Sequence, residues 1–317
     1  MKLKASSIAI VRLSNTLRIY FSLFPRTKFL QSFSTSQHSV QLPPHRNHRP
    51  TAIKTIDMLQ SSTIKTKDGI EWYCERQGTG PDLILIPSGE GDCGSLVKVA
   101  RILSDSFTVT IFDMPGMSRS TAPPYLTKAV TGPILADQVA GLMDELNIDV
   151  ATFYGSSSGG STSLCMAAQH PTRVRNALVH EVALGTLGPI EALLSMDDAA
   201  AVASCREMFA HDLNEDIEAW EALGPEYHAR LEKNYLNFVR NVVASVTKLS
   251  LSKEELTRRP VDWTIGALFP AGAFFSNVLT ATGAGIPISL LPCKHFPQVS
   301  IPEGLAEHIR SCTAKYL

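Results

Sequence analysis

The first 56 residues contain no aspartate or glutamate, whereas nine lysines and arginines fall within residues 1–57. Basic, serine-containing and acid-poor segments of this kind are typical of mitochondrial targeting peptides. Apolar stretches in this segment are interrupted by Arg12 and Arg18 and are too short to span a bilayer. We therefore expect residues 1–57 to be a basic extension that is either a mitochondrial targeting segment or a stretch preceding a translation start at Met58. A start at Met58 predicts a cytoplasmic protein.

Beyond this extension the chain lacks an excess of positive charge. The whole sequence has 29 Lys and Arg against 30 Asp and Glu, so the part after residue 57 is distinctly acidic. An acidic domain repels polyanions, which argues against a nucleic-acid partner. Long apolar runs are also missing, so we expect no membrane-spanning segment.

Paired cysteine spacings are absent as well. The six cysteines show no C-x-x-C pattern, and we expect reduced thiols. Cys93, Cys293 and His295 are conceivable metal ligands, but no second metal-ligand motif accompanies them. The sequence therefore predicts no metal and no cofactor.

Strand-like and helix-like segments alternate along the chain, with strands predicted at 82–86, 108–113 and 148–154 and a helix at 133–146. This alternation predicts an α/β fold with a mostly parallel sheet and helices on both faces. The pattern becomes helical throughout residues 185–259 before a strand pattern resumes at Trp263. We expect residues 58–184 and 260–317 to form the core domain and residues 185–259 an inserted helical cap.

The pentapeptide Gly155–Gly159 (GSSSG) fits the G-x-S-x-G nucleophile elbow, which joins a strand to a helix by a sharp turn. Its context fits, because residues 148–154 resemble a strand and residues 162–170 resemble a helix that ends before Pro171. A plain Gly/Ser linker would instead have polar, aperiodic neighbours. The motif makes Ser157 the candidate nucleophile of a serine hydrolase of the α/β-hydrolase fold.

A nucleophilic serine needs a histidine base, which comes last in the α/β-hydrolase order. Only His295 and His308 lie near the end of the chain. His295 follows the apolar strand pattern of residues 286–291 and lies in a loop, whereas His308 falls in a predicted surface helix. We expect His295 to be the base.

No aspartate or glutamate occurs between Trp263 and Pro302, where the acid of such a triad usually follows the seventh strand. The carboxylate must therefore come from elsewhere. Glu181 stands at the end of the strand pattern 175–180, at the same edge of a parallel sheet as the elbow, and its neighbours are apolar. We expect Glu181 to be the acid.

An oxyanion hole needs two convergent backbone N–H groups. The residue after the nucleophile, Ser158, would supply one. The strand 82–86 leads into the glycine-rich turn 87–92, where Gly89 would supply the other.

Several segments together make the chain similar to the fungal zearalenone lactonases, from about Ser62 to Leu317. These segments are residues 77–82, 112–120, 155–159, 180–181, 228–235, 262–264, 274–275, 290–292 and 295–297. The resemblance implies a Ser157–Glu181–His295 triad and oxyanion donors at Gly89 and Ser158. It also implies ring opening of resorcylic acid macrolactones through an acyl-enzyme, and it hints at a homodimer.

The chain departs from that family at positions that concern the substrate. Ser88 replaces an aspartate, and Phe238 corresponds to a cap tryptophan that lies against the lactone. We expect substrate contacts from Ser88, Phe238, Met208 and Phe209, although the last two could equally pack inside the cap. Two other functions stay open: an esterase or lactonase for another secondary metabolite, and a ligand receptor of the same fold without turnover.

Overall fold

Eight strands form a single sheet in the computed structural model, which describes residues 60–128, 130–185, 188–246, 249–270 and 272–317. The strand order is β1-β2-β4-β3-β5-β6-β7-β8. The strands are β1 (Gln60–Lys65), β2 (Glu71–Gln77), β3 (Asp82–Ile86), β4 (Thr108–Phe112), β5 (Ala151–Ser156), β6 (Val174–His180), β7 (Val261–Gly266) and β8 (Ile288–Leu291).

Among the described strands, the pairs β1–β2 and β2–β4 are antiparallel, and the pairs from β4 to β8 are parallel. The central strands are apolar on both faces, as parallel strands between two helical layers must be. In β3, for example, Leu83 and Leu85 belong to one buried cluster and Ile84 and Ile86 to another. The predicted mostly parallel α/β fold is confirmed.

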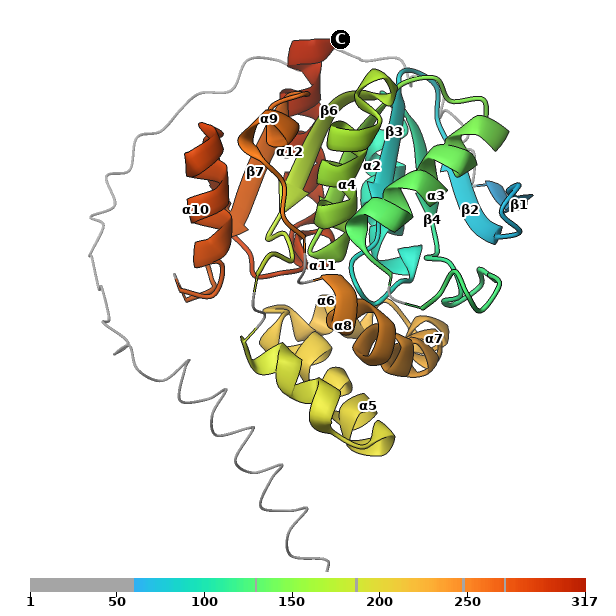
Figure 1. Ribbon diagram of the computed structural model, residues 1–317, viewed down its shortest axis with the longest axis vertical. Helices are drawn as coiled ribbons and strands as arrows, with labels where there is room; N and C mark the ends of the chain where they lie inside the picture. The colour runs from blue at the N-terminus through green and yellow to red at the C-terminus, as the bar shows by residue number, and fades with distance from the viewer. Residues whose placement is uncertain (1–59, 129, 186–187, 247–248, 271) are drawn as a thin grey trace, which may run out of the picture. The chain divides into compact units, whose positions relative to one another are not determined.

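Helices cover both faces of the sheet (Figure 1). The cluster that contains Leu83 also includes residues of α2 (Val97–Leu103) and α12 (Pro302–Thr313). The opposite face packs against α3 (Gly132–Glu145), α4 (Ser158–Gln169) and α10 (Phe275–Ala284). Shorter elements in this part are η1 (Cys93–Leu96), η2 (Pro171–Arg173), α9 (Lys253–Leu256), α11 (Pro297–Ser300) and η6 (Ala314–Tyr316).

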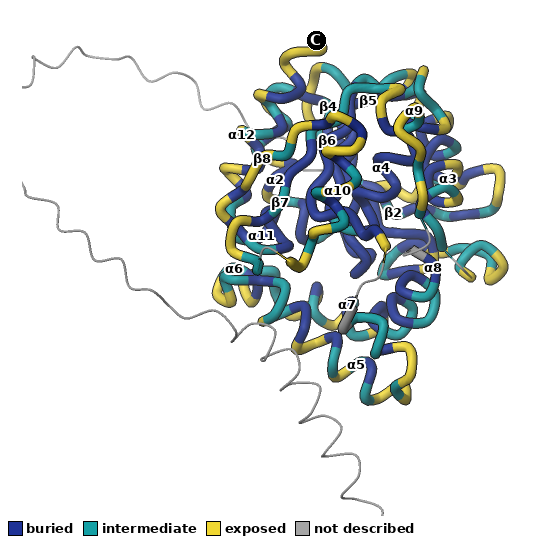
Figure 2. Tube along the Cα trace, turned by 60° about the vertical axis from the view of Figure 1, so that its left-hand side comes forward, coloured by how far each residue is buried: buried dark blue, intermediate teal, exposed yellow. Residues whose placement is uncertain are grey.

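A separate group of helices lies at one end of the sheet in Figure 1, and we call residues 188–246 the cap. It consists of η3 (Gly188–Ser195), α5 (Asp198–Glu207), η4 (Met208–Asp212), α6 (Ile217–Glu221), α7 (Pro225–Asn237), η5 (Phe238–Val243) and α8 (Ala244–Val246). Its inner surface is buried (Figure 2), and its apolar side chains join the cluster beneath α3 and α4. The cap and the strand ends therefore share one apolar interior.

The basic segment 1–57 lies outside the described residues. Within the described ranges, every helix is too short or too polar to cross a membrane. The six cysteines are free and buried.

Candidate active site

Ser157 occupies a sharp turn between β5 and α4. Its backbone angles are φ 53° and ψ −120°, which side-chain-bearing residues rarely adopt and which cost free energy. Space at this turn is available only because glycines flank it: a Cβ at Gly155 would lie 2.3 Å from the carbonyl group of Gly159. The strained serine, the strand before it and the helix after it have the geometry of a nucleophile elbow.

Backbone hydrogen bonds connect this turn to the end of β6. The N–H of Ser157 donates to the carbonyl oxygen of His180 at 2.9 Å, and the carbonyl oxygen of Ser157 accepts the N–H of Ala183 at 3.2 Å. Ser156 pairs with His180 in the parallel register, so Ser157 and Glu181 follow directly at the same edge of the sheet. The structure thus brings these two predicted residues together.

Glu181 and His295 are in direct contact. His295 Nδ1 lies 2.7 Å from Glu181 Oε2, and because a carboxylate only accepts, we assign the proton to Nδ1. Glu181 is completely buried, has a φ of 43°, and accepts the N–H of Gly266 on its other oxygen at 2.9 Å. Its N–H donates to the carbonyl oxygen of Thr264. β7 therefore holds the Glu181 carboxylate in place, although the end of β7 at Gly266 has no carboxylate of its own.

The His295 imidazole is enclosed by aromatic rings. Phe274 stacks on it with a centroid distance of 5.5 Å and an interplanar angle of 8°, and Phe296 approaches it edge-on at 5.2 Å. Between these walls, His295 is only 5% exposed. The packing restricts rotation of the ring and keeps Nδ1 on Glu181.

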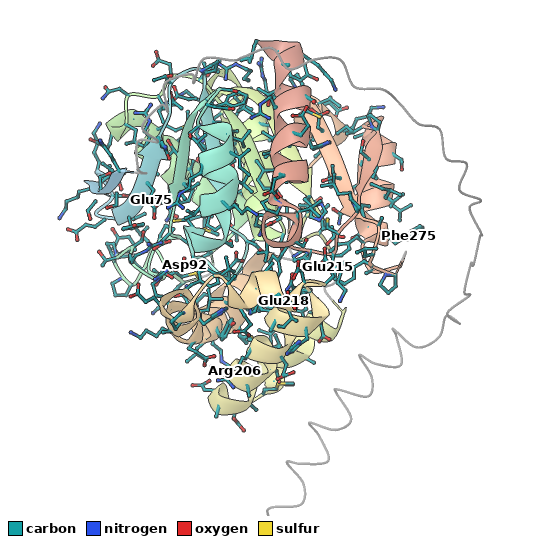
Figure 3. All side chains as sticks on the ribbon, turned by 180° about the vertical axis from the view of Figure 1, so that it is seen from behind. Glu75, Asp92, Arg206, Glu215, Glu218 and Phe275 are labelled. Atoms are coloured by element: carbon teal, nitrogen blue, oxygen red, sulfur yellow. The ribbon has the colours of Figure 1, made fainter. Side chains whose placement is uncertain are left out.

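The cap also fixes the loop that carries this histidine, through residues that the sequence analysis missed. Glu215 Oε2 accepts the N–H of Lys294 at 2.9 Å, and the carbonyl oxygen of Leu213 accepts the N–H of His295 at 3.1 Å. Figure 3 shows Glu215 where the cap meets the end of the sheet. Glu215 lies in a predicted helical region, and nothing in the sequence around it indicates a hydrogen bond to a residue 79 positions away.

His180 supports the same loop from the sheet. Its Nε2 lies 3.1 Å from the carbonyl oxygen of Lys294 and its Nδ1 lies 2.9 Å from Thr264 Oγ1. Burial lowers the pKa of His180, with the nearby Glu181 carboxylate opposing this shift. The neutral imidazole is therefore the form that this buried site favours.

The expected oxyanion loop lies between the sheet and the cap. Gly89 is buried beneath Phe238, since a Cβ at Gly89 would lie 2.5 Å from Phe238 Cε2. Ser158 starts α4, so its N–H lies at the positive end of the helix dipole. Ser88 is buried and its hydroxyl hydrogen-bonds the carboxyl group of Glu90. Burial raises the pKa of Glu90 to about 7.

The other expected substrate contacts lie in the cap's aromatic interior. Phe209 contacts Tyr235, Phe238 and Phe296, with centroid distances from 5.2 to 5.7 Å. Phe209 is 2% exposed and Met208 is 7% exposed. Phe209, through Phe296, joins the cap to the loop that carries His295.

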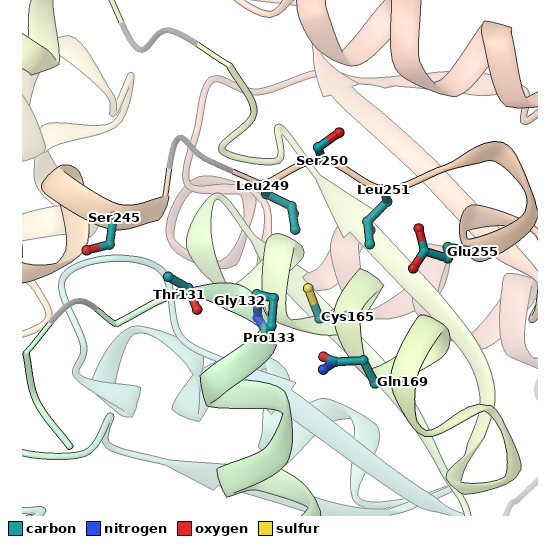
Figure 4. Close-up of a pocket in the computed structure, with 10 residues that line it drawn as sticks. All are labelled: Thr131, Gly132, Pro133, Cys165, Gln169, Ser245, Leu249, Ser250, Leu251 and Glu255. Carbon is teal, nitrogen blue, oxygen red and sulfur yellow. The ribbon is translucent and has the colours of Figure 1, made fainter.

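A pocket of about 310 Å³ opens elsewhere, between α3, α4 and the chain segment that returns from the cap (Figure 4). The residues that line it are Thr131, Gly132, Pro133, Cys165, Gln169, Ser245, Leu249, Ser250, Leu251 and Glu255. None of the candidate catalytic residues is among them. Over the part of the chain that the structure describes, no group of three or more His, Cys, Asp or Glu residues could hold a metal ion.

A serine on a strained elbow, at the same sheet edge as a buried carboxylate that fixes the orientation of a histidine, fits the arrangement that activates a hydroxyl group for acyl transfer. The backbone N–H groups expected to form the oxyanion hole are those of Ser158, at the start of α4, and of Gly89, in the facing loop, and such donors stabilise the negative charge of an oxyanion. The arrangement therefore has the parts for ester hydrolysis.

Comparison with known proteins agrees with this chemistry. The family model for the alpha/beta hydrolase fold matches residues 81–259. The chain is 46% identical over 261 residues to a zearalenone hydrolase of Cladophialophora bantiana, covering 81% of this chain and 97% of that protein. It is 41% identical to a zearalenone hydrolase of Bionectria ochroleuca, covering 82% of this chain and all of that protein.

Solved structures of low sequence identity share the fold. A putative aryl esterase from Burkholderia cenocepacia superimposes with a TM-score of 0.66 at 15% identity and covers 81% of this chain and 99% of its own. The enol-lactonase from Burkholderia xenovorans gives a TM-score of 0.61 at 19% identity, with coverages of 79% and 98%.

Proposed function

Because this chain belongs to the zearalenone hydrolase family of the α/β-hydrolase fold, we propose that it opens the lactone ring of zearalenone-type resorcylic acid macrolactones. Ser157 is the nucleophile, His295 the general base and Glu181 the acid. The observation that carries the proposal is the 2.7 Å contact of His295 Nδ1 with Glu181 Oε2, at the same sheet edge as the strained elbow of Ser157. The identities above 40% to two zearalenone hydrolases support the substrate class.

The reaction begins at the ester carbonyl. Ser157 Oγ attacks the carbonyl carbon while His295 Nε2 takes the hydroxyl proton. The N–H groups of Gly89 and Ser158 stabilise the negative charge that develops on the carbonyl oxygen. Glu181 stays ionised and stabilises the imidazolium that forms.

Collapse of the tetrahedral intermediate breaks the ring's carbon–oxygen bond. His295 returns its proton to the departing alcohol oxygen, and the acyl group remains on Ser157. Because the ester is cyclic, this alcohol stays tethered to the acyl-enzyme. Water, deprotonated by His295, must therefore attack the acyl carbon before the tethered alcohol re-forms the ring. The second tetrahedral intermediate then expels Ser157 Oγ, which takes its proton back from His295, and the ring-opened hydroxy acid is released.

Incubation of the purified protein with zearalenone, followed by liquid chromatography and mass spectrometry, tests the proposal. We expect a product heavier than the substrate by one water molecule, and no such product with the Ser157→Ala protein. Saturable binding without turnover by the wild-type protein would contradict the proposal and favour a receptor. Turnover of simple aryl esters without turnover of zearalenone would contradict the substrate class alone.

A further inference from the structure

One face of α7 follows the oxyanion loop, residues 88–94, along its length. Four residues at spacings of three or four contact it in turn: Tyr227, Arg230, Asn234 and, one position beyond the helix, Phe238. Their respective partners in the loop are Gly94, Asp92, Glu90 and Gly89. This spacing puts the four side chains on one helical face.

Asn234 connects two loops of the core to the cap. Its side-chain amide donates to the carbonyl oxygen of Glu90 at 2.8 Å and to Ser118 Oγ at 2.7 Å. Its Oδ1 accepts the N–H of Ser118 at 2.9 Å. Both amide hydrogens and the oxygen are used, and the side chain is buried. Loss of these bonds would leave buried polar groups unpaired.

The Glu90 carbonyl belongs to the turn that presents Gly89. The N–H of Gly91 donates to the carbonyl oxygen of Ser88 at 3.0 Å, which closes a four-residue turn with Gly89 at its second position. The peptide group between Glu90 and Gly91 is thus held at both ends, by Ser88 and by Asn234. Rotation of that peptide would break its bond to the Ser88 carbonyl, which belongs to the same planar peptide group as the N–H of Gly89.

Arg230 holds the far end of the same loop. Its Nε and Nη2 atoms donate to the two carboxylate oxygens of Asp92 at 2.5 and 3.1 Å. Asp92 is fully buried and its Oδ1 also accepts the N–H of Gly94. Figure 3 shows Asp92 where the core meets the cap. The Asn234 bond therefore fixes the turn itself, and the charged pair fixes the residue that follows it.

We propose that Asn234 and Arg230 are positioning residues, through which helix α7 of the cap sets the direction of the Gly89 N–H in the oxyanion hole. The inference rests on the proposed hydrolysis. It assigns to the cap a role in catalysis besides the expected substrate contact of Phe238, since α7 also aligns the donor that stabilises the transition state.

Asn234→Asp is the sharpest test, because it keeps the side chain's shape and the acceptor for Ser118 while placing an oxygen against the Glu90 carbonyl. A matched control on the same helix is Glu232→Gln, which breaks only the exposed ion pair with Arg206. The assay is hydrolysis of a p-nitrophenyl ester, together with binding of an aryl trifluoromethyl ketone, which forms a tetrahedral oxyanion adduct with an active serine.

For Asn234→Asp we expect kcat to fall about 10- to 100-fold with KM changed less than about threefold, because misdirecting one oxyanion donor costs less than removing it. Affinity for the ketone should fall by the same factor as kcat/KM, while Glu232→Gln stays close to wild type in both. Arg230→Gln should lower kcat and ketone affinity in the same way but by a smaller factor. This variant provides the test if Asn234→Asp does not fold.

Unchanged kcat and unchanged ketone affinity in a folded Asn234→Asp or Arg230→Gln protein would overturn the inference, even if its melting temperature fell. A rise in KM with unchanged kcat would likewise overturn it, because it would show that the residue contacts the substrate and does not align the Gly89 N–H. Wild-type protein that hydrolyses neither the p-nitrophenyl ester nor zearalenone would instead contradict the proposed function itself.

Discussion

The backbone N–H of Gly266 donates a 2.9 Å hydrogen bond to Oε1 of Glu181. Gly266 ends β7, near the place from which the acid would come if β7 supplied it, and this chain has no acid between residues 263 and 302. The carboxylate arrives from β6 instead and uses β7 as a hydrogen-bond donor. Its second oxygen remains available to His295.

Glu181→Gln should reduce kcat by about 10³-fold or more, because the amide keeps the shape but loses the charge that stabilises the imidazolium and fixes its tautomer. Asp262→Asn is the matched control, since Asp262 lies on the neighbouring strand β7 and forms an ion pair with the exposed Lys315. Steady-state kinetics on a chromogenic ester measure both. Equal kcat for Glu181→Gln and wild type would refute the assignment of the acid.

Ser157→Ala should lower kcat by at least about 10³-fold while leaving ligand affinity close to that of wild type, because it removes the nucleophile and almost no contact surface. Ser156→Ala, one position earlier in the strand, should keep most of the activity. Calorimetry with zearalenone checks the affinity. An active Ser157→Ala protein beside an inactive Ser156→Ala protein would mean that the elbow's register is misassigned.

Phe238→Leu should raise KM for zearalenone several-fold, with a smaller effect on kcat. Leucine preserves apolar bulk beside Gly89 and Phe209 but offers no aromatic face to a resorcylic ring, and such a contact is worth about 1 kcal/mol. Thermal unfolding controls for lost packing, which we expect to stay below about 1.5 kcal/mol for this change. An unaltered KM would place Phe238 outside the substrate site.

Glu90→Gln should make the protein more stable than wild type above pH 7. Burial raises the pKa of Glu90 to about 7, and the acidic and phenolic groups that face it, Asp92, Tyr154, Tyr227 and Tyr235, supply no positive charge. The folded state therefore binds a proton that the unfolded chain releases near pH 4.5, so stability contributed by this group is lost as pH rises from about 4.5 through 7.

Denaturant unfolding from pH 4.5 to 8 measures this effect. The advantage of Glu90→Gln over wild type should grow across that interval and reach on the order of 2 kcal/mol. A constant difference between the two proteins over the whole range would show that Glu90 is not protonated in the folded state.

The sequence predicted those features whose signal is local. The apolar run at 82–86 gave β3 with its observed bounds, and the glycines around Ser157 fit the observed turn. Glu181 could be singled out because the alternative positions held no carboxylate. Its contact with His295 followed from the parallel sheet, which brings strand ends to one edge.

Contacts between cap and core were not predictable in the same way. Asn234 and Glu90 are 144 residues apart, and Glu215 and Lys294 are 79 apart. Polar residues on an amphipathic helix usually face solvent, so Arg230 and Asn234 gave no reason to expect buried partners. Only the docking of α7 on the oxyanion loop reveals them.

Labelling with a fluorophosphonate, followed by peptide mapping, tests the account most directly, because the reagent forms a covalent bond only with an activated serine. We expect one equivalent of label on the peptide that contains Ser157, labelling strongly slowed by Glu181→Gln or His295→Ala, and protection by zearalenone. An ester-hydrolysing protein that carries the label at another residue, or reacts equally fast without Glu181 and His295, would contradict the Ser157–His295–Glu181 assignment.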